Sequence, residues 1–232
     1  SITTPFGDTT FRFRERRGYQ GLFPGAVAVV GGAERPHNRF GFGAIDHVTS
    51  NFQTMKPALL WMEHVLGLEQ LWQVAFHTSD VDPARQTGSG LKSIVMWDPG
   101  SGVKFATNEP LRPFFRASQI AKFVEDNGGN GVQHIAFAVT NILWSVEELK
   151  RREVEFMPTH PAYYTHLPER LAKLGITNVA AELAELERLQ ILVDGAHDKY
   201  MLQIFMREAA AMYDENRAGP FFYEIIQRAG DE

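Results

Sequence analysis

The stretch GVQHIAF, residues 131–137, reads as a buried strand with a histidine in its middle. Most of its residues are apolar and favour β-structure, but Gln133 and His134 are polar. Because successive side chains in a strand point to opposite faces, His134 shares one face with the small residues Ala136 and Ala138. That face leaves room around the imidazole, and we expect the opposite, bulky face to pack on helices.

The same order of elements occurs on both sides of this stretch. A helical period follows it over 141–154, then an insertion from 157 to about 188 with a helical stretch over 178–189. Apolar runs typical of strands close the chain at 190–195, 200–207 and 221–228. The earlier half has the same order: a strand at 44–52, a helix at 55–68, strands at 68–76, 91–98 and 103–110, and a short helix and turn at 117–130. The sequence therefore predicts a βαβββ unit that occurs twice.

Two such modules can close one sheet into an open, mostly antiparallel β-barrel with helices outside, an α+β fold. We place the modules at about 43–130 and 131–232, within one domain that spans 43–232. Residues 6–19 contain Phe11 and Phe13 in alternation, which indicates a further strand, and a Gly- and Pro-rich segment follows. We therefore expect residues 1–42 to be the tail of a missing N-terminal domain plus a linker.

Composition narrows the classes of function. The 232 residues are 44% hydrophobic and 22% charged, with a net charge of −5, so we expect neither a nucleic-acid surface nor a membrane-binding patch. There are no cysteines, which excludes disulfides and thiolate ligands and fits the cytoplasm. A metal site in this chain must therefore use His, Asp or Glu.

Three polar residues lie in strands that otherwise suit burial: His47, His134 and Glu224. A buried carboxylate is costly unless it is paired, and a divalent cation between the three side chains would remove that cost. Two histidines and one carboxylate form the facial triad of non-haem Fe(II) oxygenases. Each residue also has an ordinary interpretation, either a hydrogen-bonded core histidine or a glutamate at a sheet edge.

Several short motifs resemble, in the same order, the C-terminal catalytic half of 4-hydroxyphenylpyruvate dioxygenases. They are FGDTT, ERRGY, IDH at 45–47, NEP at 108–110, SQI at 118–120, GVQHIAF, ILVD at 191–194, LQIF at 202–205 and EIIQR at 224–228. The family has the vicinal oxygen chelate (glyoxalase-like) fold of paired βαβββ modules. The resemblance implies an enzyme of tyrosine and phenylalanine catabolism that uses Fe(II) and O2 to convert 4-hydroxyphenylpyruvate to homogentisate and CO2.

The resemblance also implies roles for individual residues. His47, His134 and Glu224 would bind Fe(II), and Phe205 and Phe222 would stack on the substrate ring. The polar residues that would contact the substrate are Ser93, Asn108, Gln119 and Gln203. The chain is further expected to form a homo-oligomer, either a dimer or a tetramer.

Some features depart from the family. Ala106 stands where the family usually has proline, the link before Glu224 is longer, and the chain ends at Glu232 where the family continues into a lid. Gln133 is expected near the pocket by resemblance, whereas strict alternation turns it away from His134. Two alternatives therefore stay open: 4-hydroxymandelate synthase, which acts on the same substrate, and a non-catalytic module of the same fold.

Overall fold

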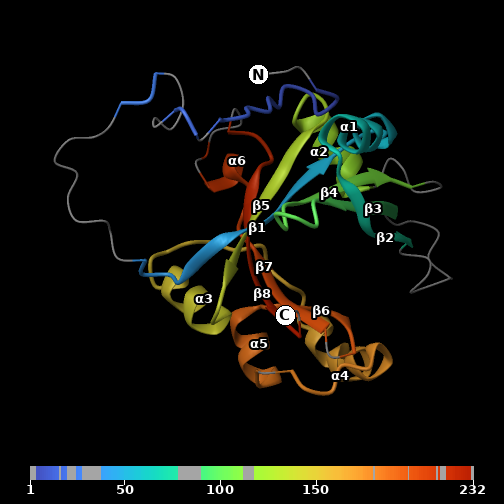
Figure 1. Ribbon diagram of the computed structural model, residues 1–232. Coiled ribbons are helices and arrows are strands. Elements are labelled where there is room, and N and C mark those ends of the chain that lie inside the picture. Colours follow the sequence, from blue (N-terminus) through green and yellow to red (C-terminus); the bar gives the residue numbers. More distant parts are fainter. Residues whose placement is uncertain are drawn as a thin grey trace.

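The structure is a computed structural model of the chain, shown in Figure 1. It describes residues 4–15, 17–19, 25–27, 38–77, 90–111, 118–179, 181–197, 199–212, 214 and 218–230. Most of the expected linker before residue 38 lies outside the described residues. Within them, no helix is both long and apolar enough to cross a membrane.

The predicted βαβββ order is confirmed in both halves. The first module consists of β1 (Phe42–Asn51), α1 (Lys56–Leu66), β2 (Glu69–His77), β3 (Gly90–Trp97) and β4 (Lys104–Pro110), and α2 (Gln119–Asp126) follows. The second consists of β5 (Gly131–Val139), α3 (Ile142–Lys150), α4 (Ala162–Leu174), α5 (Leu183–Leu189), β6 (Leu192–Ala196), β7 (Lys199–Phe205), α6 (Ala209–Met212) and β8 (Phe222–Ala229). The insertion thus forms α4 as well as the expected helix α5.

All the strands join one sheet in the order β2-β3-β4-β1-β5-β8-β7-β6. The modules meet where β1 pairs antiparallel with β5, and in each module the first strand pairs parallel with the last, β1 with β4 and β5 with β8. The other neighbouring pairs are antiparallel. The mixed, mostly antiparallel sheet confirms the predicted open α+β architecture, and Figure 1 shows β1 and β5 passing through its centre.

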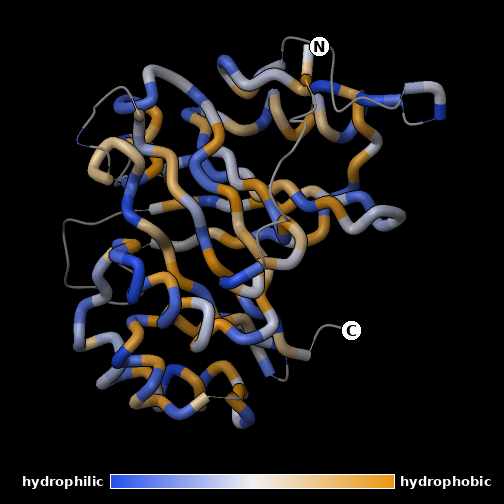
Figure 2. Tube along the Cα trace, turned by 90° about the vertical axis from the view of Figure 1, so that its left-hand side faces the viewer, coloured by the Kyte–Doolittle hydropathy of each residue, from blue (hydrophilic) through white to orange (hydrophobic). Residues whose placement is uncertain are grey.

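Apolar residues hold helices against the sheet in two clusters. The larger cluster joins Val139, Leu202 and Ile225 of the sheet to α3, α4 and α5, as expected for the bulky face of β5. The smaller cluster packs α1 and the N-terminal Phe6 against β3. Figure 2 shows apolar and polar residues alternating where the chain crosses the sheet, so opposite faces of a strand meet different surroundings.

The strand expected over residues 6–19 is wrong. Among the described residues of that segment, only Phe11 takes part in a β-bridge, and the rest is irregular. The Phe11 ring instead packs edge-on against Phe6 and Trp61, while Phe13 is exposed. Aromatic packing against α1, with a single β-bridge rather than a strand, therefore holds Phe11 in place.

Candidate metal centre

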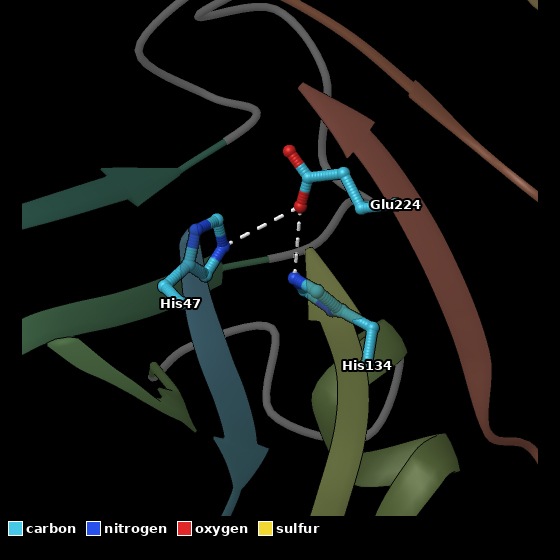
Figure 3. A group of neighbouring side chains, drawn as sticks. All are labelled: His47, His134 and Glu224. Atoms are coloured by element: carbon cyan, nitrogen blue, oxygen red, sulfur yellow. Dashed lines mark ion pairs between the residues drawn. The ribbon is translucent and has the colours of Figure 1, made fainter. Parts of the chain in front are cut away.

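Three strands from the two modules bring His47, His134 and Glu224 to one point. His47 on β1 and Glu224 on β8 both lie opposite Ala136 of β5, which places them on the same face as His134. Figure 3 shows the two imidazoles pointing toward the Glu224 carboxylate from β1 and β5. Residues far apart in the sequence thus form one cluster because β5 lies between the other two strands.

The distances in this cluster suit a single divalent cation. Glu224 Oε2 lies 3.1 Å from His134 Nε2 and 3.4 Å from His47 Nε2, and the three ligand atoms lie within 4.8 Å of one another. Two ligand atoms with bonds of about 2.1 Å at right angles to a metal are about 3 Å apart. Glu224 is 2% exposed, and its Oε1 and His134 Nε2 have no hydrogen-bond partner among the described residues. Unpartnered buried ligand atoms that converge in this way fit a metal ion.

The electrostatics of the cluster follow from burial and from pairing. Burial disfavours the charged form of Glu224, but the His134 and His47 imidazoles beside it outweigh burial and lower the pKa of the carboxyl. Burial alone would lower the pKa of His47, but hydrogen bonds with Asp46 and Glu224 outweigh it and raise the pKa to about 9. For His134 burial dominates and lowers the pKa, so this imidazole is neutral. The three side chains therefore carry one negative charge, on Glu224, and one positive charge, on His47.

Each imidazole is also held from behind by the residue that precedes it. His47 Nδ1 lies 2.7 Å from Asp46 Oδ1, and His134 Nδ1 lies 3.0 Å from Gln133 Oε1. Arg228 of β8 donates two hydrogen bonds to Asp46, of 2.7 and 2.8 Å. Burial opposes ionisation of Asp46, but the Arg228 and His47 hydrogen bonds outweigh it and hold the pKa of that carboxyl well below its usual range.

Two of the register irregularities between β1 and β5 lie directly beside the ligand histidines. Ile45 pairs with Phe137 and His47 with Ala136, so Asp46 is an extra residue in β1. Ile45 therefore lies on the Phe137 face and is exposed, although strict alternation would put it on the same face as His47. In β5 the extra residue is Gln133, since Thr49 pairs with His134 and Ser50 with Val132.

The aromatic residues predicted for the site lie beside the triad. Phe222 is buried and stacks on the His134 ring, with centroids 5.0 Å apart and an interplanar angle of 19°. Phe205 lies opposite Glu224 and meets the His134 ring edge-on at 5.9 Å. Phe222 thus packs directly on one of the candidate ligand imidazoles.

Three of the predicted polar residues lie on strands of the sheet, and the fourth lies on a helix. Ser93 of β3 and Asn108 of β4 lie directly opposite each other, and Gln203 lies two residues before Phe205 on β7. Gln119 is exposed at the first position of α2. The sheet register therefore brings Ser93 and Asn108 together, whereas Gln119 comes from a helix outside the sheet.

Sequence reasoning missed three polar residues near the site: Asn51, Asp46 and Arg228. Asn51 is fully buried, and its Oδ1 accepts a hydrogen bond of 3.0 Å from Asn108 Nδ2. The sequence did contain a signal for Asn51. It lies two residues after Thr49 and four after His47, so alternation puts all three side chains on the same face. No local signal marks Asp46 and Arg228, because their pairing depends on the bulge in β1.

Comparison with known proteins agrees with this geometry. Residues 44–167 match the Glyoxalase/Bleomycin resistance protein/Dioxygenase superfamily. The chain is 36% identical to 4-hydroxyphenylpyruvate dioxygenase of Dictyostelium discoideum over 98% of its length and 34% identical to that of Caenorhabditis elegans over 98%. It spans 60% and 56% of the lengths of these two relatives.

A solved structure with the same fold comes from a related enzyme. A triple mutant of 4-hydroxymandelate synthase from Streptomyces coelicolor superimposes with a TM-score of 0.62 at 26% sequence identity. The match covers 82% of this chain and 50% of that one. The curated relatives and this structure carry the two enzyme names that the motifs had suggested.

Proposed function

The chain belongs to the Glyoxalase/Bleomycin resistance protein/Dioxygenase superfamily, and on this basis we propose that residues 43–232 form the catalytic domain of a 4-hydroxyphenylpyruvate dioxygenase. The proposed reaction converts 4-hydroxyphenylpyruvate and O2 to homogentisate and CO2. One oxygen atom enters the new side-chain carboxylate, and the other enters the ring. The observation that carries the proposal is the buried cluster of His47, His134 and Glu224.

In this proposal the three side chains hold Fe(II) and leave coordination positions open. Bound Fe(II) would supply O2 activation and a Lewis acid for the 2-oxo acid group of the substrate. The ligand set suits this role because it combines two neutral nitrogen donors with one anionic oxygen once His47 has lost its proton. Ala136, which is fully buried between His47 and Glu224, leaves the space that the ion needs.

The surrounding residues would bind and orient the substrate. Phe205 and Phe222 form an apolar wall beside His134 that excludes water from one side of the site. We assign the phenol end to the polar group of Ser93, Asn108 and Gln203, with Gln119 contributing from α2. Asn51 would hold the Asn108 amide through its hydrogen bond. Binding at both ends would align the ring with the reacting carbon.

The test is a product assay on the full chain. Protein loaded anaerobically with Fe(II) receives 4-hydroxyphenylpyruvate and air, while O2 uptake is followed and products are separated by chromatography. We expect homogentisate in a one-to-one ratio with O2 consumed, and none from the His134→Ala variant. The control is His64→Ala, which removes an exposed histidine on α1. If 4-hydroxymandelate is the only product, the synthase assignment replaces this one, and if Fe(II) does not bind, the fold serves a non-catalytic role.

A further inference from the structure

The two histidine-bearing strands contain the same irregularity at the same relative position. In β1 the bulge residue is Asp46, immediately before His47, and in β5 it is Gln133, immediately before His134. A bulge turns an extra side chain toward the face from which alternation would exclude it. Each module therefore places a polar side chain beside its own ligand imidazole.

Both polar side chains present an oxygen to the ring atom that faces away from the cluster. Asp46 Oδ1 and Gln133 Oε1 lie 2.7 and 3.0 Å from the Nδ1 atoms of His47 and His134. An oxygen acceptor at Nδ1 requires the proton on that nitrogen, which leaves the Nε2 lone pair free for a metal. Both Nε2 atoms accordingly point at Glu224, as Figure 3 shows.

The two supports differ in charge and in how they are anchored. Asp46 carries a negative charge that Arg228 balances through two hydrogen bonds, and the Asp46 side chain is 7% exposed. Arg228 lies on β8, the strand that supplies Glu224. One strand thus provides a ligand and also holds the support of a second ligand on β1. Gln133 supports His134 with a neutral amide.

We propose that Asp46, anchored by Arg228, and Gln133 are positioning residues that fix the tautomer and orientation of the two ligand imidazoles. The inference rests on the proposed function, since it assigns their role at the same metal centre. Loss of an outer partner of a metal ligand typically weakens metal binding about 10–100-fold.

The test measures Co(II) binding to the metal-free chain by its visible absorption bands, which report both affinity and ligand geometry. We expect Asp46→Asn and Gln133→Leu each to weaken Co(II) binding about 10–100-fold and to change the band positions. Gln133→Glu keeps an oxygen at Nδ1, so we expect it to show the Co(II) affinity and the band positions of the wild type. The matched control is Asp194→Asn, because Asp194 is also paired with an arginine, Arg170, but on the exposed surface of β6.

The outcomes separate this inference from the proposed function. If His134→Ala abolishes Co(II) binding while Asp46→Asn and Gln133→Leu keep the wild-type affinity and spectrum, the positioning role is wrong and the metal centre stands. If His134→Ala binds Co(II) as wild type does, the metal centre itself is wrong. If circular dichroism shows that Asp46→Asn does not fold, Gln133→Leu and Arg228→Lys decide the question by the same two measurements.

Discussion

Replacement of Ala136 by valine should remove metal binding while the sheet stays folded. Ala136 has no exposed surface, and its neighbours across the sheet are His47 on one side and Glu224 on the other. The ligand atoms of these neighbours are already only 3.4 Å apart. Two added methyl groups on Ala136 would therefore take up the space beside these ligands that the ion needs.

The expected magnitude follows from that crowding. Overpacking of a full site costs about 1–3 kcal/mol of unfolding free energy. A shift of about 1 Å in the His47 ring, enough to admit the methyl groups, takes Nε2 beyond the roughly 2.1 Å that a metal–nitrogen bond requires. Because a ligand itself is then lost, we expect Co(II) affinity to fall more than about 100-fold, beyond the usual effect of an outer partner.

The assay compares Ala136→Val with Ala138→Val. Ala138 lies two residues along β5 on the same face, is half-buried and pairs with Ile226 rather than with a ligand. The two variants make the same change in the same strand, so the β-propensity of valine cancels. Co(II) titration gives the affinities, and urea denaturation gives the unfolding free energies. Equal Co(II) affinities for the two variants would refute the placement of the ligands over Ala136.

Three further predictions concern stability and pH. Co(II) at about 100 times its dissociation constant should stabilise the chain by about 2.7 kcal/mol, or about 5–10 °C in melting temperature, and Glu224→Ala should show no such rise in calorimetry. Ile225→Ala should cost about 2–5 kcal/mol in urea denaturation because Ile225 is fully buried, whereas Ile45→Ala, at an exposed site, should cost little. The pKa of His47 is raised to about 9, and a metal binds only its neutral form. Co(II) affinity should therefore rise about tenfold per pH unit from pH 7 to 9 and then level off. A flat profile over that range would contradict the assignment of His47 as a metal ligand.

Much of the fold was predictable because it depends on local periods. Alternation and helical spacing identified the strands and helices that became the two modules, and the apolar face of β5 correctly implied helices behind it. The strand expected around Phe11 was wrong because alternation of two phenylalanines cannot reveal whether a partner strand exists. In the structure those residues had Trp61 and Phe6 to pack on instead.

The candidate site divides in the same way. The positions of His47, His134 and Glu224 in apolar strands were enough to select them as ligand candidates. Burying a polar group in such a strand is costly unless it has a partner. The contrast between resemblance and parity at Gln133 could not be resolved from the chain alone. It is resolved by the bulge in β5, which turns Gln133 toward the Nδ1 atom of His134.

The sequence by itself determined the residue types, the two-module order and the three ligand candidates, since these follow from local composition and period. Only the tertiary structure decided that β5 lies between β1 and β8, and so which side chains meet. It also decided the bulges at Asp46 and Gln133, and with them the Arg228 anchor. A bulge is a mismatch in register between two strands, so it has no existence in either strand alone.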